Sequence, residues 1–363
     1  MKLWILSLVA ATVATPFTAA ATDLLTVANT PTNSPIKASA EKLDRFSPEL
    51  AARYLDIASL NWQKDRNCVT CHTNMAYLMA RPALESASRS SGEVRNFFQD
   101  YINERWKEDE RKPKSGDYRT VVVATGLVFN DIQTKGVVSE VTEQALSFMW
   151  DTQRADGGWT WAKCGWAPME IDDHYGVSLA VLSAGIAATY DTEKQVTSKG
   201  MPQAIDYLKN HSAPSLHHRI MLAWASRYSD GILDHNQQMA IVKEVLSSQL
   251  ADGGWSTAKM LADWPEFKRK DKTPPRLNAS DGYATGLALV LLREFGIAPT
   301  QTPITRGIDW IKDNQDSDGK WFSPSPSKDS KQFFTNIGTA FTILGLQASG
   351  EIPGWPFQLK TSD

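Results

Sequence analysis

Three cysteines and a histidine are the residues of this chain with the clearest capacity for chemistry. Cys68, Cys71 and His72 form a Cys-x-x-Cys-His motif. With this spacing, two thiols can add covalently to the vinyl groups of haem while the histidine ligates the iron. The motif therefore predicts a covalently attached c-type haem with His72 as a ligand of the haem iron.

Two other structures suit the same residues. Cys68 and Cys71 could form a short disulfide in an exported protein. Alternatively, both cysteines, Cys164 and one histidine could form a tetrahedral zinc site. If haem is bound, the ligand on its second face must come from a distant segment, because Met75 and Met79 share the helix of His72. The candidates for that second ligand are Met169, His174, His217 and His218.

A second cluster, Glu170, Asp172, Asp173 and His174, follows Cys164 by one loop. Clustered carboxylates do not all ionise easily, so the pKa of one is expected to rise, whereas a helix N-terminus or a nearby cation lowers it. These four residues are the candidate catalytic group, although aspartates in such positions also serve simply as helix N-caps. The candidate metal ligands are His72, Cys164, His174, His217 and His218.

Helices of two kinds would position these residues. Residues 137–152, 202–210 and 304–314 mix charged and apolar residues at spacings of three and four, which is typical of amphipathic helices. The other kind is nearly free of charge, which predicts burial on all sides. These apolar segments are residues 121–129, 177–188, 283–292 and 338–347.

Pairing each amphipathic helix with the apolar helix that follows gives six units. Such a series predicts an all-α fold, a closed (α/α)6 toroid, because an open array would expose apolar faces at both ends. If the inner helices are parallel, their N-termini gather the thiols, imidazoles and acids at one rim. The inner helices are expected to begin near residues 72, 119, 173, 217, 280 and 335.

A repeated turn supports this architecture. The sequence Gln-x-x-Asp-Gly-Gly-Trp occurs at residues 153–159 and 249–255, and with one lysine for glycine at 315–321. This pattern resembles the QW repeat of squalene–hopene cyclases and of protein prenyltransferase β subunits. The resemblance implies an (α/α)6 toroid over residues 42–350.

The same resemblance suggests three functions. The cyclases carry Asp-x-Asp-Asp where this chain has Glu170-x-Asp172-Asp173, which makes Asp172 the counterpart of their proton donor. Prenyltransferase β subunits hold a catalytic zinc at the mouth of the ring, and secreted single-toroid relatives begin their first inner helix with CxxCHT. The resemblance thus implies a haem-bearing redox or ligand-binding protein, a cyclase-like or zinc-assisted enzyme, or a non-catalytic scaffold.

Composition limits the setting and the partners. The 363 residues are 42% hydrophobic with thirteen tryptophans, enough for a large core, and a net charge of −3 without a basic stripe argues against nucleic acid. Residues 1–21 resemble a signal peptide, 22–41 a linker and 351–363 a tail. We expect export to the periplasm or beyond the cell, no stable membrane span, and a small apolar molecule or a redox protein as partner.

Overall fold

The computed structural model describes residues 39, 41–84, 89–105, 117–190, 199–265, 267–330 and 333–357. The expected signal peptide lies outside these residues, as does nearly all of the expected linker. Within the described ranges the chain forms helices and isolated β-bridges, and no β-strand. None of the helices described there has the length and apolar character needed to cross a membrane.

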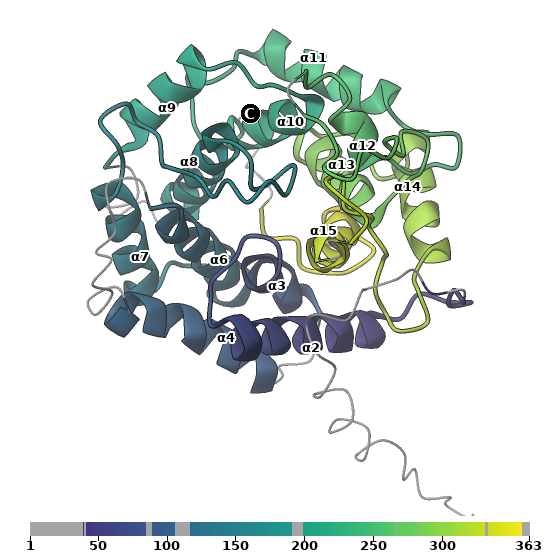
Figure 1. The fold of residues 1–363 in the computed structure, drawn as a ribbon, viewed down its shortest axis with the longest axis horizontal. Coiled ribbons are helices and arrows are strands. Elements are labelled where there is room, and N and C mark those ends of the chain that lie inside the picture. Colours follow the sequence, from purple (N-terminus) through teal and green to yellow (C-terminus); the bar gives the residue numbers. More distant parts are fainter. Residues whose placement is uncertain are drawn as a thin grey trace, which may run out of the picture.

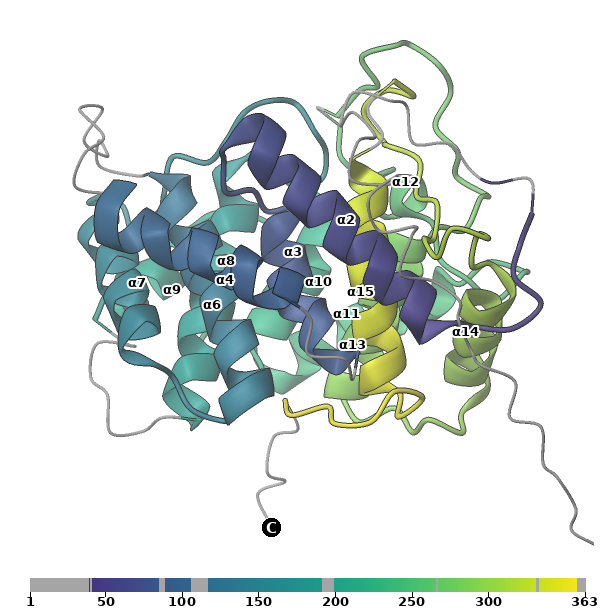
Figure 2. The ribbon, with the colours of Figure 1, turned by 90° about the horizontal axis from the view of Figure 1, so that it is seen from below.

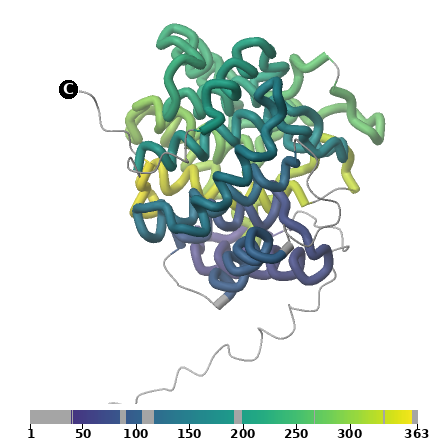
Figure 3. The backbone as a smooth tube through the Cα atoms, turned by 90° about the vertical axis from the view of Figure 1, so that its left-hand side faces the viewer, coloured from purple at the N-terminus to yellow at the C-terminus, as the bar shows by residue number. Residues whose placement is uncertain are grey.

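Six helices form an inner ring. Each one packs against the next, and the last packs against the first, which closes the ring (Figure 1). Figures 1 and 3 both place the last helix, in yellow, beside the first helices, in purple. The inner helices are α3 (Asn74–Ala80), α6 (Tyr118–Lys135), α8 (Asp173–Tyr190), α10 (Leu216–Ala225), α13 (Gly282–Glu294) and α15 (Phe334–Ala348).

An outer helix precedes each inner helix, so the described residues form the predicted all-α (α/α)6 toroid. All six inner helices begin within two residues of their predicted positions. The outer helices are α2 (Pro48–Arg66), α4 (Arg89–Asp100), α7 (Glu140–Asp151), α9 (Met201–Asn210), α11 (His235–Ser247) and α14 (Thr302–Asp313). Three short helices lie in the connections: η1 (Arg81–Ala83), η2 (Tyr101–Arg105, a π-helix) and α12 (Thr257–Met260).

The repeated turn joins each of three outer helices to the next. Each turn tryptophan donates its indole N–H to a carbonyl ten residues earlier in the preceding outer helix, at 2.7–3.0 Å. Each turn glutamine donates its amide to the carbonyl of the turn glycine and to a carbonyl at the start of the next outer helix. The conserved geometry of the three turns explains the repeated sequence pattern.

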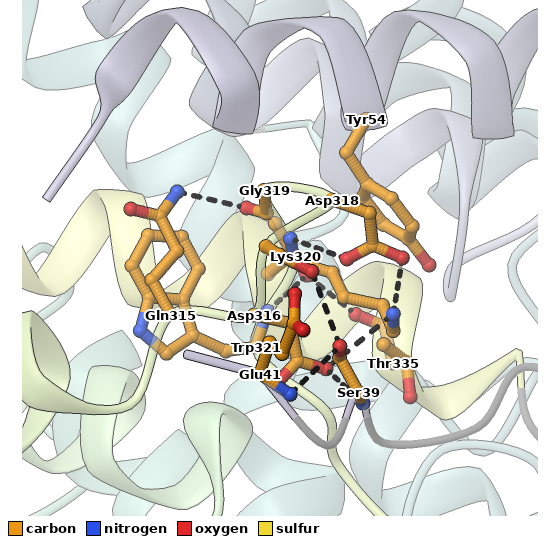
Figure 4. Close-up of polar contacts among 12 residues, drawn as sticks. Ser39, Glu41, Tyr54, Gln315, Asp316, Asp318, Gly319, Lys320, Trp321 and Thr335 are labelled. Atoms are coloured by element: carbon orange, nitrogen blue, oxygen red, sulfur yellow. Dashed lines mark hydrogen bonds and ion pairs between the residues drawn. The ribbon is translucent and has the colours of Figure 1, made fainter. Parts of the chain in front are cut away.

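The third turn closes the ring on the first outer helix. Gln315 donates to the Ser47 carbonyl at 2.9 Å and accepts the Ser47 N–H at 2.8 Å, and Ser47 is the N-cap of α2. Figure 4 shows Gln315 donating to Gly319. Gly319 has a φ of 94°, and a Cβ there would lie 2.2 Å from the Leu50 carbonyl oxygen. This close approach therefore requires glycine.

The segment after α15 covers one edge of the ring. The fully buried Phe357 packs against Phe129 of α6, with ring centroids 4.9 Å apart. Figure 2 shows this segment on the edge opposite the long loops. Inside the ring, the fully buried Trp224 packs against Phe129 and Phe341. These aromatic residues therefore form core and do not line an open cavity.

Candidate functional site

The N-termini of the inner helices lie at one rim beneath loops that are bonded to each other. Ser327 donates to the Gly165 carbonyl at 2.7 Å, and Lys270 donates its backbone N–H to the Ser327 carbonyl at 2.8 Å. Three connections, which precede α8, α13 and α15, cover this rim: residues 152–172, residues 256–265 and 267–281 with α12 among them, and residues 321–330.

Four residues, here called the rim cluster, meet at this edge: Cys71, His72, Cys164 and Glu170. Cys71 Sγ donates to Glu170 Oε1 at 3.8 Å, and His72 Nε2 lies 3.8 Å from the same oxygen. The Cys164 thiol interacts electrostatically with the same carboxyl group. The structure thus joins residues that the sequence placed in separate motifs.

All three cysteines are free thiols, so the expected alternative of a Cys68–Cys71 disulfide is absent from this structure. Cys68 is partly exposed, and its Sγ donates to the Val69 carbonyl at 3.2 Å. Its backbone carbonyl accepts from the Trp62 indole at 3.0 Å and from Asn74 at 3.1 Å, which fixes the chain just before α3.

Hydrogen bonds and aromatic rings hold the His72 side chain in place. Its Nδ1 lies 2.8 Å from Thr73 Oγ1, and this oxygen accepts from Asn336 Nδ2 at 3.1 Å. Because Nδ1 is occupied in this way, Nε2 is the nitrogen directed towards Glu170. Three rings pack against the imidazole with centroid distances of 4.7–6.0 Å: Trp62, Trp166 and Phe333.

Burial keeps much of the rim cluster uncharged. It lowers the pKa of His72 to about 3, so the imidazole is neutral. Burial and the neighbouring Glu170 carboxyl raise the pKa of the Cys71 and Cys164 thiols, which therefore stay protonated at neutral pH. Burial also raises the pKa of Glu170, and its interactions with the two thiols oppose that rise.

Asp172 and His218 form a pair beside the rim cluster. His218 Nε2 lies 3.0 Å from Asp172 Oδ2, and His218 Nδ1 lies 2.8 Å from Ser215 Oγ. Asp172 also caps α8 by accepting the Tyr175 N–H at 3.1 Å. Burial alone would raise the pKa of Asp172, but its contact with His218 lowers it. This arrangement suits an ionised carboxylate that caps α8 and pairs with His218.

The other two rim histidines are buried and neutral. His217 Nε2 lies 2.7 Å from the Tyr283 hydroxyl, and the His174 ring packs edge-on against His218 at a centroid distance of 5.7 Å. Burial lowers the pKa of His174 to about 4, and burial with the neighbouring His218 lowers the pKa of His217 well below its usual value. Within the described residues, neither histidine forms a hydrogen bond or an ion pair with a residue of the rim cluster.

Asp173 likewise lies apart from the rim cluster. Arg154 Nη1 donates to its carboxylate at 2.7 Å, and the Trp161 N–H donates to it at 3.1 Å, so Asp173 anchors the loop to α8. Across the described part of the chain, no three His, Cys, Asp or Glu side chains are placed closely enough around one point to hold a metal ion as they stand.

The cavity beside His72 tests whether haem fits. His72, Trp166, Met169 and Glu170 are among the residues that line it, and its volume is about 10 Å³. This is space for about one water molecule. The two thiols and the histidine that haem attachment needs are present, and Met169, one of the four candidate second ligands, lines the same cavity. In this conformation, however, the cavity is too small for a porphyrin.

Sequence reasoning missed the partners of the site histidines. Ser215 lies three residues before His218, the spacing of a helix N-cap and its N3 residue, and this signal was available. Asn336, Trp166 and Phe333 lie beside His72 only because the ring is closed. No local pattern in the sequence could have paired them with that residue.

No family model and no curated protein matches this chain. Among solved structures, one described as a polysaccharide lyase is similar, with a TM-score of 0.47 and 10% sequence identity. The similarity covers 82% of this chain and 96% of that chain. Because this similarity is low, it carries no conclusion about activity, and the assignment of a toroid rests on the contacts among the described helices.

Proposed function

We propose that the rim cluster is a metal-binding site and that the protein uses it, after export, for redox chemistry or for binding a small molecule. The observation that carries the proposal is the convergence of Cys71, His72 and Cys164 on one carboxyl group, that of Glu170. Structural packing alone gives no reason to gather two thiols, an imidazole and a carboxyl group at the edge of a fold.

The separations within the rim cluster support this proposal. With ligand bonds of about 2.0–2.3 Å, the donors around a tetrahedral ion lie roughly 3.4–3.8 Å apart. Cys71 Sγ and His72 Nε2 each lie 3.8 Å from Glu170 Oε1. Since no three donors yet surround one point, binding requires Cys164 to turn inward. Its thiol is exposed and already interacts with the Glu170 carboxyl, so the movement starts from a position beside the other donors.

The donor types indicate a thiophilic ion. Thiolates with imidazole select Zn²⁺ or Cu⁺, and a carboxylate is a further zinc ligand. A metal bound there would supply a Lewis acid or an electron carrier at the rim. His72 is already neutral and held through Nδ1, as metal-ligating histidines usually are.

Covalent haem is the second candidate. The Cys68-x-x-Cys71-His72 motif and the presence of Met169 in the same cavity favour it. It requires residues 164–170 to move away from His72. The resemblance to secreted single-toroid proteins, supported by the three repeated turns, is compatible with either cofactor.

One experiment separates the candidates. The protein is expressed with and without the machinery for c-type haem attachment, and its intact mass, visible spectrum and metal content are measured. Cys68→Ser removes a thiol needed for covalent haem, whereas Cys164→Ser removes a proposed metal ligand. We expect stoichiometric metal that persists in Cys68→Ser and is lost in Cys164→Ser. Covalent haem that shows the opposite dependence would replace the metal proposal, and the absence of both groups would refute both.

A further inference from the structure

A second cavity, of about 250 Å³, opens at the rim between the loop that follows Cys164 and the loop that follows α12. Its apolar lining consists of Ile171, Trp264 and Phe267. The rings of Trp264 and Phe267 are stacked, with centroids 5.7 Å apart and an interplanar angle of 28°. These residues belong to a small hydrophobic cluster that is separate from the main core. Trp264 is buried, so the apolar surface that faces the cavity comes mainly from the partly buried Ile171 and Phe267.

Positive charge borders this apolar surface. Lys163, Lys268 and Lys270 line the cavity, and no acidic residue is among its described lining. Lys270 Nζ donates to the Cys164 carbonyl at 3.0 Å. Because a carbonyl carries no formal charge, this hydrogen bond does not balance the positive charge of Lys270. Lys163 Nζ lies 3.6 Å from Asp173, whose carboxylate is already paired more closely with Arg154. The cavity thus carries more positive charge than its described surroundings balance.

Lys268 is the clearest member of this group. Its side chain is exposed, and it forms no ion pair or hydrogen bond with any other residue that the structure describes. No described polar contact of the fold therefore uses the Lys268 ammonium group. An anion bound in the cavity would give this group a partner.

We propose that this cavity binds a small organic anion with a flat apolar body, of which an aromatic carboxylate is the simplest case. Ligand pockets typically have volumes of about 300–1,000 Å³, so this cavity of about 250 Å³, just below that range, suits only a small ligand. The partly buried ring of Phe267 favours a planar group, since aromatic rings pack well against one another. The lysines select a negative charge. No lining residue belongs to the rim cluster, so this inference does not depend on the metal site.

The test is a titration of the metal-free, full-length protein with 1-naphthoate, followed by calorimetry. The uncharged 1-naphthamide has nearly the same shape and serves as the comparison ligand. Lys268→Glu reverses the charge at the cavity, and Lys243→Glu makes the same change at an exposed position on α11. We expect saturable 1:1 binding of 1-naphthoate, weakened about tenfold by Lys268→Glu and by replacement with the amide, and unchanged in Lys243→Glu.

Three outcomes would overturn the proposal. These are equal affinity for the acid and the amide, equal weakening by both lysine variants, and no saturable binding of 1-naphthoate to folded protein. Thermal unfolding of each variant confirms that it is folded, and Phe267→Ala, which shortens the apolar surface and keeps every lysine, provides a second variant that should also weaken binding. Since the titration uses metal-free protein, its failure leaves the metal proposal unaffected.

Discussion

Cys71 Sγ lies 3.8 Å from Glu170 Oε1, although the two residues are 99 positions apart in the chain. Cys71 lies three residues before the first inner helix, and Glu170 lies in the loop before the third. The contact therefore exists only because the inner helices are parallel and their N-termini share one rim.

Glu170→Gln should weaken binding of Zn²⁺ or Cu⁺ at the rim by at least about tenfold, because the substitution removes a charged donor. Affinity in the wild-type protein should rise with pH, since the protonated thiols must lose protons to become ligands. Competition with a chromophoric chelator measures both effects. Asp172→Asn is the matched control, a rim carboxylate outside the cluster, and an equal loss of affinity there would contradict the assignment.

Asp172→Ala should reduce the free energy of unfolding by about 2–4 kcal/mol. The loss of an N-cap costs about 1 kcal/mol. A buried histidine left without its partner costs about 1–3 kcal/mol. Asp172→Asn retains a good capping residue, so it should lose only about half as much. Urea unfolding at neutral pH measures both variants, and an unchanged stability of Asp172→Asn would show that the His218 contact does not contribute.

Glu294 should make the protein less stable as the pH rises towards neutrality. Burial raises the pKa of Glu294 to about 7. Tyr228 supports this, because its hydroxyl lies 2.9 Å from Glu294 Oε2 and 2.7 Å from the Phe357 carbonyl. A hydroxyl has one proton, so both contacts are hydrogen bonds only if Glu294 supplies the second proton.

The folded pKa of Glu294 lies above its unfolded value of 4.5, so its contribution to stability is complete below that value. It is lost as the pH rises through about 7, a change of about 3 kcal/mol. The test is to measure the free energy of unfolding from pH 4.5 to 8 for the wild type and for Glu294→Gln, and the difference between the two proteins should change with pH. The wild type should lose more stability than the variant, and parallel pH profiles would show that Glu294 is already ionised in the folded protein.

Gln315→Ala should destabilise the protein more than the equivalent change in an earlier turn. Gln315 makes three hydrogen bonds through its amide, including two with Ser47 that close the ring, whereas Gln249 makes two. At about 1 kcal/mol for each hydrogen bond, the expected losses are about 3 and about 2 kcal/mol. Denaturant unfolding of the two variants compares them directly. A larger loss for Gln249→Ala would argue that the third turn does not hold the ring closed.

The sequence by itself determined the toroid, because its signals are local. Apolar periodicity identifies a helix within its own segment, and the repeated Gln and Trp bond to groups in their own turn, in the preceding outer helix and at the start of the next. It also named Cys71, His72, Cys164 and Glu170, since their residue types are those that bind metals or haem.

Only the tertiary structure decided which of these residues meet. It placed Asp172 against His218 and Asp173 against Arg154, and it left Glu170 with the thiols and His72. It also assembled the lysines of the second cavity from two separate loops. Side chains from different helical units come together only when the ring has closed. Their protonation depends on burial, and they become buried only in the closed ring.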